Sequence, residues 1–371
     1  MATTILVFCV GGLLSLGLVM LYSSSMVQTG ARFLLMQLVW CAIALGGCAL
    51  AAAIDYRWLK KVSWLLVLVA LGLLIAVLVP PFRELRGGAS RWIDLGFASF
   101  QASELAKLAL IVALAHYMER HQRQTHLFTR GLVVPGILIV VFLGLIFVEP
   151  DYGTTLLLAA VCGVVLLTGG VRWRHFLPPV TLGTVVVVVA ILQNPLRLNR
   201  ILAWLNPEQF RMGTGYQADQ AMVALGAGGV TGLGLGNGRQ KLGFVPEHHT
   251  DFIFSIIGEE LGLIGTFGVA VGFMMLVFCG LTIAARTRDM FGFLLATGIT
   301  FLIGLQAFIN MAVNTSVLPN KGLPLPFISY GGSNLLMSMV CVGLLISIAR
   351  RNGETHHARE LSAREIPSPA T

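Results

Sequence analysis

The residue types that could do chemistry gather in residues 213–265, where a glycine-rich stretch leads to Asp251, directly before an apolar segment. A carboxylate in that place has two interpretations. It stabilises the N-terminus of a helix through the helix dipole, or it takes a proton from a hydroxyl at the mouth of a membrane cavity. A general base needs a pKa raised by burial, which opposes the effect of the dipole on that pKa. The residues alone leave both interpretations open.

The same stretch combines cations with a high density of glycine. Seven glycines fall within residues 226–238, Arg239 and Lys241 follow them, and Arg197 and Arg200 lie one helical turn apart upstream. The backbone amides of such a loop can approach an anion closely, as in phosphate-binding nests. The loop matches no nucleotide-binding fingerprint, however. The loop therefore permits an anion to approach its backbone, but it does not predict a nucleotide.

A second cluster surrounds Glu104 and Lys107. Ser103 is the predicted N-cap of a helix whose first turn contains Glu104. Lys107 lies three residues further on, so it shares a helix face with Glu104. Lys107 either snorkels and pairs with Glu104, or presents a cation to an anionic headgroup. Arg91 and Trp92, just upstream, fit an interfacial anchor and a phosphate clamp equally well.

Four further acids lie at the edges of apolar segments. Glu149 and Asp151 occupy a short connection without a basic residue. Acids so near a membrane are costly unless they are paired or functional. Asp151 is interpreted as a helix cap or, alternatively, as a group that binds a cation or an arginine of the large loop 194–250. Glu259 and Glu260 point about 100° apart on a helix, so we expect only one of them to face a cavity.

The last cluster is an irregular segment at residues 318–333. It contains three prolines and three glycines, which exclude a regular helix, and Lys321 is its only charged residue. Irregular backbone at membrane depth is tolerated where it is buried in protein or lines a wet cavity. We therefore predict that Lys321 is a functional cation.

The elements that must position these clusters follow from composition. The chain is 56% hydrophobic and 11% charged, with a mean hydropathy of +0.83, whereas soluble domains have about 25% charged residues. The fold class is therefore an all-α integral membrane protein. The net charge of +8 is interpreted as basic cytoplasmic loops, so no nucleic acid partner is expected. The six cysteines lie in apolar stretches and are predicted to be packing residues.

Ten membrane-spanning helices are predicted from runs of about 20 apolar residues. Their approximate bounds are 4–22, 33–54, 63–80, 103–118, 132–148, 153–169, 178–193, 261–284, 291–312 and 334–349. The even-numbered connections and the segment after the last span carry 14 of the 25 basic residues. The positive-inside rule therefore places both termini in the cytoplasm. Residues 1–349 form a single membrane domain with a large extracytoplasmic loop, 194–250, between spans seven and eight, and residues 350–371 form a cytoplasmic tail, predicted to be disordered.

Several of these runs together resemble the SEDS family (shape, elongation, division and sporulation). They cover the chain from about residue 90 to 340, and they favour the division type of the family over the elongation type. The matching runs are Arg91-Trp92-Ile93, Phe100-Gln101, Ser103-Glu104-Leu105-Ala106-Lys107, Gly215-Tyr216-Gln217, Gly232 to Gly236, Pro246-Glu247, His249-Thr250-Asp251-Phe252-Ile253-Phe254, Gly258 to Gly262, Lys321-Gly322, Pro324-Leu325-Pro326 and Ser329-Tyr330-Gly331-Gly332-Ser333.

The resemblance implies a glycosyltransferase of the bacterial inner membrane that polymerises lipid II into peptidoglycan strands. Asp251 aligns with the family's essential acid and would deprotonate a sugar hydroxyl, directly or through water, while undecaprenyl pyrophosphate leaves. The cations expected to bind that pyrophosphate are Arg91, Lys107, Arg200 and Lys321. Glu247 and Glu104 would orient them, and Ser329 is also assigned to substrate binding. A divalent cation, Mg or Mn, is a possible cofactor, and a class B penicillin-binding protein (a transpeptidase) is the expected partner.

Two functions from other classes compete with this interpretation. A transporter that flips lipid II would need the same cations and a similar groove, but it should tolerate asparagine in place of Asp251. A scaffold that holds and activates a transpeptidase would tolerate changes to all polar cavity residues. The polar residues lie on one side of the predicted bilayer, which favours the enzyme, because a carrier should also have polar groups deeper in the membrane.

Overall fold

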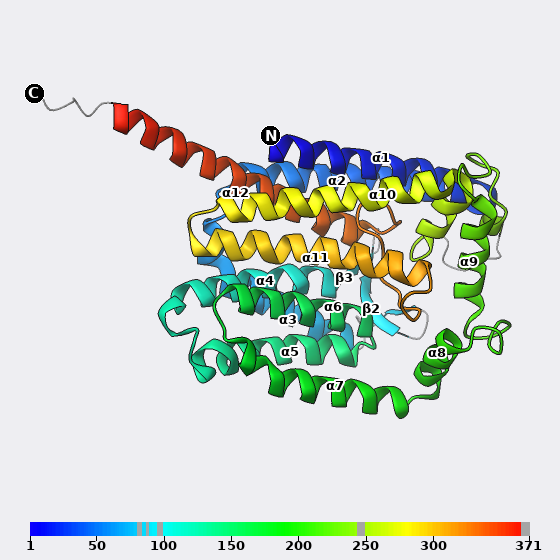
Figure 1. The fold of residues 1–371 in the computed structure, drawn as a ribbon, viewed down its shortest axis with the longest axis horizontal. Helices are drawn as coiled ribbons and strands as arrows, with labels where there is room; N and C mark the ends of the chain where they lie inside the picture. Colours follow the sequence, from blue (N-terminus) through cyan, green and yellow to red (C-terminus); the bar gives the residue numbers. More distant parts are fainter. Residues whose placement is uncertain (80–83, 87–88, 95–98, 243–248, 365–371) are drawn as a thin grey trace, which may run out of the picture.

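The computed structural model describes residues 1–79, 84–86, 89–94, 99–242 and 249–364. Most of its helices lie side by side in an elongated bundle, and α8 and α9 lie beyond one end of it (Figure 1). The helices are α1 (Ala2–Thr29), α2 (Arg32–Ala53), α3 (Trp58–Leu78), α4 (Ala102–Arg120), α5 (Val134–Val148), α6 (Tyr152–Thr168), α7 (Leu177–Leu192), α8 (Pro195–Leu205), α9 (Tyr216–Gly228), α10 (Ile253–Arg286), α11 (Met290–Asn314) and α12 (Gly332–Arg364). Short helical turns occupy Gln122–Gln124, Thr129–Val133, Trp173–Phe176 and Gln240–Leu242.

The predicted class, an all-α membrane protein, is confirmed. Among the described residues, eight helical segments are long and apolar enough to cross a membrane: α1, α2, α3, α5 with its preceding turn, α7 with its preceding turn, α10, α11 and α12. Predicted spans four and six correspond to α4, which carries four charged residues, and to α6, which is apolar but shorter. The count of ten spans therefore stays a prediction.

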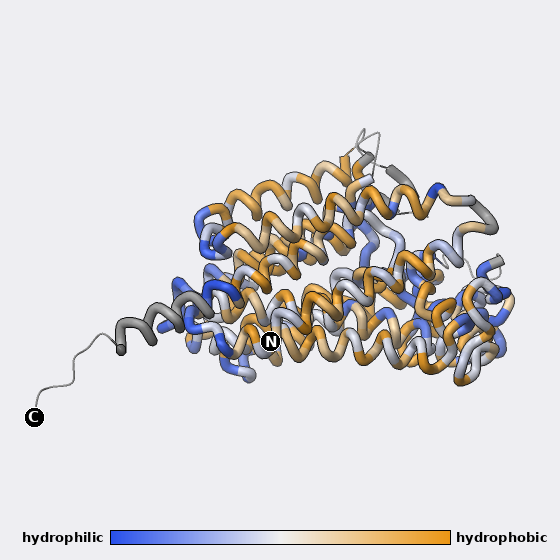
Figure 2. Tube along the Cα trace, turned by 90° about the horizontal axis from the view of Figure 1, so that it is seen from above, coloured by the Kyte–Doolittle hydropathy of each residue, from blue (hydrophilic) through white to orange (hydrophobic). Residues whose placement is uncertain are grey.

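The start of α1 and the end of α12 lie at the end of the bundle opposite α8 and α9 (Figure 1). Hydrophilic residues gather at the two ends, and the middle of the bundle is hydrophobic (Figure 2). Ion pairs join neighbouring turns at the end that holds the termini, for example Lys60 with Glu119 at 2.6 Å and Arg351 with Asp55 at 3.4 Å. This arrangement agrees with an even number of crossings.

The core of the bundle lies along α4, α11 and α12. In the most apolar windows of α11 and α12, 67% of the residues are buried, against 0% for the α7 segment. Fourteen of the 19 residues of α4 are buried, including the charged pair Glu104 and Lys107. Polar groups on α4 and α11 are consequently inside the protein, whereas α7 is at its periphery.

A small antiparallel sheet between α3 and α4 was not predicted. It consists of β1 (Glu84–Arg86), β2 (Ala89–Asp94) and β3 (Ser99–Gln101) in the order β1-β2-β3. Because β3 runs directly into α4, the N-cap is Gln101, and the prediction of Ser103 as N-cap is wrong. Ser103 Oγ instead accepts a hydrogen bond of 2.9 Å from Gln101 Nε2.

Two further predictions about the outer segments need correction. The loop 194–250 is partly helical, because it contains α8 and α9. Predicted span eight begins at residue 261, but α10 begins at Ile253 and is broken at Gly262, where φ is 67° and ψ is −162°. The acids Glu259 and Glu260 interrupt the apolar pattern there, so hydropathy alone does not detect the first turns of α10.

Candidate functional site

The backbone at Asp251 is fixed by two asparagines of α11. The Asp251 carbonyl accepts hydrogen bonds from Asn310 Nδ2 at 2.8 Å and Asn314 Nδ2 at 2.9 Å. Asn310 Nδ2 also donates to the Leu323 carbonyl at 2.7 Å. Asn310 thus joins the segment that contains Asp251 to the irregular segment that follows α11.

These asparagines were missed in the sequence, although a signal was present. Gln306, Asn310 and Asn314 are four residues apart, so they lie on one face of an otherwise apolar helix. Polar side chains at such spacing within a membrane helix face the protein interior. The three residues form a row of polar side chains on α11 that bond to the Asp251 backbone or to the irregular segment.

The Asp251 carboxylate packs against Gly322. A Cβ atom at residue 322 would lie 2.7 Å from Asp251 Oδ2, closer than such atoms approach one another. Ser329 connects the same two segments, because its hydroxyl donates to the Thr250 carbonyl at 2.6 Å and accepts from the Leu325 amide at 2.8 Å. Ser329 is buried, so its contacts fit a residue that positions the loops.

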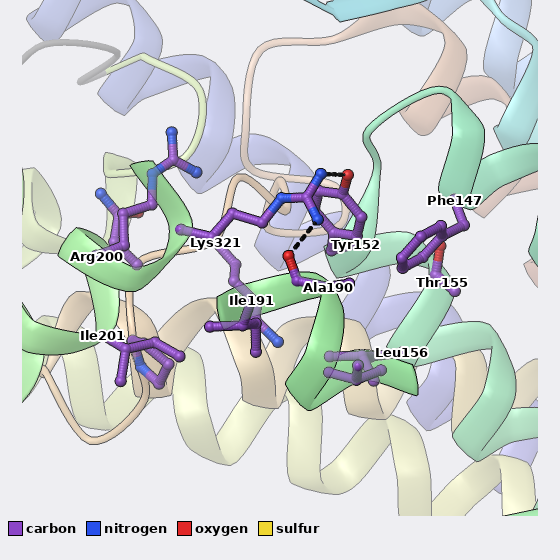
Figure 3. Close-up of a pocket in the computed structure, with 13 residues that line it drawn as sticks. Phe147, Tyr152, Thr155, Leu156, Ala190, Ile191, Arg200, Ile201 and Lys321 are labelled. Carbon is purple, nitrogen blue, oxygen red and sulfur yellow. Dashed lines mark hydrogen bonds between the residues drawn. The ribbon is translucent and has the colours of Figure 1, made fainter. Parts of the chain in front are cut away.

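A cavity of about 270 Å³ is lined in part by Lys321, the residue before Gly322 (Figure 3). Residues of α5, α6, α7, α8 and the segment after α11 line it, and those that argue for a function are Tyr152, Arg197, Arg200 and Lys321. Its other lining residues are mostly apolar, and no acid is among the described residues that line it. The cavity can therefore receive an anionic group against an apolar wall.

The three cations of this cavity differ in how they are held. The Arg197 guanidinium donates to the Tyr152 hydroxyl and, at 2.9 Å, to the Ala190 carbonyl, and it stacks over the Tyr152 ring at 3.9 Å. Arg200 is exposed. Burial lowers the pKa of Lys321 from its usual value, because it disfavours the charged ammonium. Within the part of the chain that is described, Arg200 and Lys321 form no ion pair, so both can bind a ligand.

Arg91 holds the turn before α6. Its guanidinium donates to the carbonyls of Glu149 at 3.3 Å and Pro150 at 2.5 Å, and it lies 4.0 Å from Asp151 Oδ1. Asp151 caps α6 by accepting from the Thr154 amide at 3.1 Å. The capping role is confirmed, and the arginine partner comes from β2, not from the large loop. The turn leads to Tyr152, so Arg91 holds the backbone next to a residue that lines the cavity.

Glu149 is buried in the same turn. Neither carboxylate oxygen has a hydrogen-bond partner among the described residues. Burial, with a smaller contribution from the negative charge of Asp151, raises the pKa of Glu149 to about 8. The side chain is therefore mainly protonated at neutral pH, which avoids an uncompensated buried charge.

Lys107 and Glu104 form an interior ion pair. Lys107 Nζ lies 3.0 Å from both Glu104 oxygens and 2.9 Å from Gln306 Oε1, and Lys107 is only 2% exposed. Of the two interpretations of Lys107, the structure supports the pairing with Glu104. Gln306 Nε2 also donates to the Pro324 carbonyl at 3.0 Å. Lys107 therefore lies beneath the irregular segment and does not line the cavity.

The backbone amides of the glycine-rich loop do bind anionic groups, but these groups are carboxylates of the protein itself. Amides of Gly236, Arg239 and Gln240 donate to the carboxylates of Glu259 and Glu260. Both acids are buried, at 1% and 0% exposure, and neither lines the cavity described above. Glu247, which was predicted to orient the cations, lies outside the described residues.

The remaining predictions concern metals and cysteines. No group of three or more His, Cys, Asp or Glu side chains is close enough to hold a metal within the described ranges. Within those ranges, an ion at Asp251 would therefore need ligands from a bound substrate. The six cysteines are free thiols in apolar surroundings, as predicted.

Comparison with known proteins finds similarity over nearly the whole chain. The family model of FtsW, RodA and SpoVE, described as cell cycle proteins, matches residues 3–354. A probable peptidoglycan glycosyltransferase FtsW of Trichlorobacter lovleyi is 41% identical over 93% of this chain and 92% of its own length. The protein of the same name from Coxiella burnetii is 38% identical over 93% of this chain and 95% of its own length.

Solved structures are similar over the same extent. A chain described under "Structural coordination of polymerization and crosslinking by a peptidoglycan synthase complex" has a TM-score of 0.80 and 29% identity, covering 94% of this chain and 97% of that one. The rod shape determining protein RodA of Thermus thermophilus has a TM-score of 0.70 and 26% identity, covering 94% and 96%.

Proposed function

This chain belongs to the FtsW, RodA and SpoVE family of cell cycle proteins, and on that premise we propose that it is a peptidoglycan glycosyltransferase of the division type. Its substrate is lipid II, a disaccharide-peptide linked through a diphosphate to undecaprenol. Relatives about 40% identical over most of the chain bear the name of this activity. The observation that carries the proposal is the packing of the Asp251 carboxylate against Gly322. Gly322 follows Lys321, which lines the cavity.

The proposed reaction is a single displacement at the anomeric carbon of one glycan. A sugar hydroxyl of a second lipid II attacks that carbon, and its proton passes to the Asp251 carboxylate, directly or through a water. The bond between the anomeric carbon and the diphosphate oxygen breaks, so undecaprenyl pyrophosphate leaves with the electron pair. The hydroxyl attacks from the side opposite the leaving diphosphate, so this single displacement inverts the configuration at the anomeric carbon.

Cations are needed where the leaving diphosphate accumulates negative charge. Lys321 and Arg200 line one cavity and form no ion pair with the described residues, so they suit this role best. Arg91 and Lys107, also predicted to bind the diphosphate, contribute indirectly, since Arg91 holds the turn before Tyr152 and Lys107 supports the irregular segment through Gln306. The apolar wall of the cavity would contact the first part of the polyprenyl chain.

A divalent cation such as Mg²⁺ or Mn²⁺ would neutralise the diphosphate. Mg²⁺ is often bound by one or two carboxylates together with substrate phosphates. Asp251 could supply one carboxylate, but the described residues do not form a protein metal site of three ligands. The residues thus fit an ion only weakly, and no step of the proposed reaction depends on one.

The proposed setting is the bacterial inner membrane, with both termini in the cytoplasm and α8 and α9 outside. The basic turns at the end that holds the termini support this orientation. The structural neighbour with a TM-score of 0.80 comes from a peptidoglycan synthase complex. We therefore propose a class B penicillin-binding transpeptidase as the partner that crosslinks the strands.

The test compares the wild type with Asp251→Asn in proteoliposomes that contain the transpeptidase partner and labelled lipid II. Glycan strands are resolved on gels. Asp251→Asn should abolish strand formation, whereas Asp219→Asn should retain it, because Asp219 belongs to an exposed pair with Arg211 in the outer segment. Strands formed by Asp251→Asn at the normal rate would remove the base assignment.

The same assay separates the competing functions. A flippase would move labelled lipid II across the vesicle bilayer and would form no strands, with or without Asp251. If the protein is a scaffold, another enzyme forms the strands. The amount of strand should then be the same with Asp251→Asn as with the wild type. The names of the relatives favour the polymerase.

A further inference from the structure

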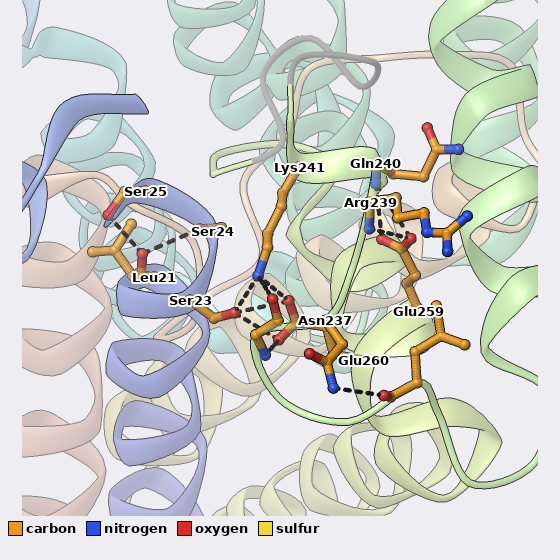
Figure 4. Close-up of polar contacts among 12 residues, drawn as sticks. Leu21, Ser23, Ser24, Ser25, Asn237, Arg239, Gln240, Lys241, Glu259 and Glu260 are labelled. Atoms are coloured by element: carbon orange, nitrogen blue, oxygen red, sulfur yellow. Dashed lines mark hydrogen bonds and ion pairs between the residues drawn. The ribbon is translucent and has the colours of Figure 1, made fainter. Parts of the chain in front are cut away.

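Two adjacent buried acids on α10, Glu259 and Glu260, are 1% and 0% exposed. Two neighbouring carboxylates away from water are unstable unless their charges are compensated. Their partners come from the glycine-rich loop and from α1, two segments far apart in the sequence (Figure 4). This polar cluster is therefore a junction between three parts of the chain.

The two carboxylates are compensated in different ways. Glu259 accepts from the backbone amides of Arg239 at 2.7 Å and Gln240 at 3.2 Å. Glu260 forms an ion pair of 2.7 Å with Lys241 Nζ and accepts from the Ser23 hydroxyl of α1 at 2.7 Å. We call the contacts among Ser23, Lys241, Glu259 and Glu260 the latch. Lys241 is 2% exposed, so the latch is closed to solvent.

The loop also replaces the helical hydrogen bonds lost where α10 breaks. In a continuous helix the amides of Leu263 and Ile264 would donate to the carbonyls of Glu259 and Glu260. Here they donate to the carbonyls of Gly229 at 2.9 Å and Val230 at 3.2 Å. The freed Glu259 and Glu260 carbonyls accept from the amides of Leu233 and Gly234, both at 3.0 Å.

Glycine is required on both sides of this junction. Gly262 has a φ of 67°, and a Cβ atom there would lie 2.4 Å from the Gly232 amide nitrogen. Gly232 has a φ of 81°, and a Cβ there would lie 2.1 Å from the Glu260 carbonyl oxygen. The break in α10 and the close approach of the loop therefore depend on each other.

The latch fixes the far end of the helical segment that follows Asp251. This segment, residues 253–261, is held near Asp251 by Asn310 and Asn314 and at its other end by the latch. At 1.5 Å per residue, nine residues separate the two attachments by about 14 Å. In addition, the Lys241–Glu260 ion pair joins the two ends of the segment 241–260. Asp251 lies midway along that segment in the sequence.

We propose that Glu260, held by Lys241 and Ser23, is a positioning residue that sets the Asp251 carboxylate through the first turns of α10. The outer loop and α1 thereby control the reactivity of the site. This inference rests on the proposed function, because it assigns Glu260 a role in the same reaction. A displacement of about 1 Å at a catalytic group can reduce a rate by about 100-fold, so a loosened latch should reduce turnover.

The experiment measures kcat, KM for lipid II and the pH-rate profile of Glu260→Gln in the complex with the transpeptidase. Glutamine keeps the volume but cannot pair with Lys241. We expect kcat to fall about 10- to 100-fold with KM within about twofold, and the acid limb of the profile to move, since the surroundings of Asp251 change. Exchange of the pair, Lys241→Glu with Glu260→Lys, should recover part of kcat.

For each variant, thermal unfolding is measured in detergent and the folded fraction is measured by gel filtration. Asp219→Asn is the control for the removal of a charge. Normal kcat and an unchanged pH profile per folded Glu260→Gln molecule would overturn the positioning role. Asp251→Asn separates the two proposals. An inactive Asp251→Asn beside a normal Glu260→Gln contradicts only the latch, whereas an active Asp251→Asn contradicts the proposed function itself.

Discussion

The cavity lined by Lys321 and the latch around Glu260 both contain basic side chains but differ in charge balance. In the latch, each carboxylate has a cation or backbone amides as partners, and every side chain is buried or half-buried. The cavity is lined by Arg197, Arg200 and Lys321 without an acid among its described lining residues. A balanced, closed cluster holds the fold together, whereas an open cluster with surplus charge of one sign can bind a ligand of the opposite sign.

Lys107 shows why residue type alone does not separate these two cases. It looks like Lys321 in the sequence, since each is a cation at the edge of an apolar segment. Lys107 is 2% exposed and paired with Glu104, while Lys321 is half-buried at the cavity. The difference lies in which residues surround each ammonium. Three substitutions, in order of decreasing effect, test whether the distinction holds.

The largest expected effect comes from Lys241→Met, which breaks the latch. Removing one partner of a buried ion pair leaves the other charge uncompensated and costs about 3–5 kcal/mol. We expect a marked drop in the thermal unfolding midpoint, followed in detergent by tryptophan fluorescence. Lys61→Met is the matched control, because Lys61 is exposed at the other end of the bundle. Equal midpoints for the two variants would contradict a stabilising role for the latch.

Lys321→Met tests the cavity. Loss of one preorganised group that stabilises developing negative charge lowers turnover by about 100- to 1,000-fold. Because Lys321 has no ion-pair partner among the described residues and its burial disfavours the charge, the unfolding midpoint should be maintained. Strand formation from labelled lipid II measures the activity, and Lys321→Arg should keep part of it. A loss of stability without loss of turnover in folded protein would reverse the assignment of the two regions.

A smaller effect is expected from Gly322→Ala, because Gly322 packs against the Asp251 carboxylate. The added methyl group would lie 2.7 Å from Asp251 Oδ2 and must displace the carboxylate. We expect turnover to fall about 10- to 100-fold with little change in KM. Gly331→Ala should behave as wild type, because a Cβ at residue 331 has no atom within 4 Å. Equal rates for the two variants would show that the position of Asp251 is not critical.

Much of this architecture was predictable from the sequence. Long apolar runs gave the helical membrane class, and glycine and proline marked the segment around Lys321 as irregular. The motif around Asp251 indicated the family. The first turns of α10 and the sheet before α4 were not predicted, because acids interrupt the apolar pattern of one and the strands of the other are too short to produce a clear alternation.

The sequence by itself determined which segments are apolar, where the backbone must bend and which acid resembles a catalytic base. Only the tertiary structure decided which charges neutralise one another. Ser23 and Glu260 are 237 residues apart in the chain and yet lie 2.7 Å apart, and Lys107 meets Gln306 across 199 residues. Hydropathy and turn preference are properties of neighbouring residues, whereas the compensation of a buried charge depends on contacts between distant segments that form only when the helices pack.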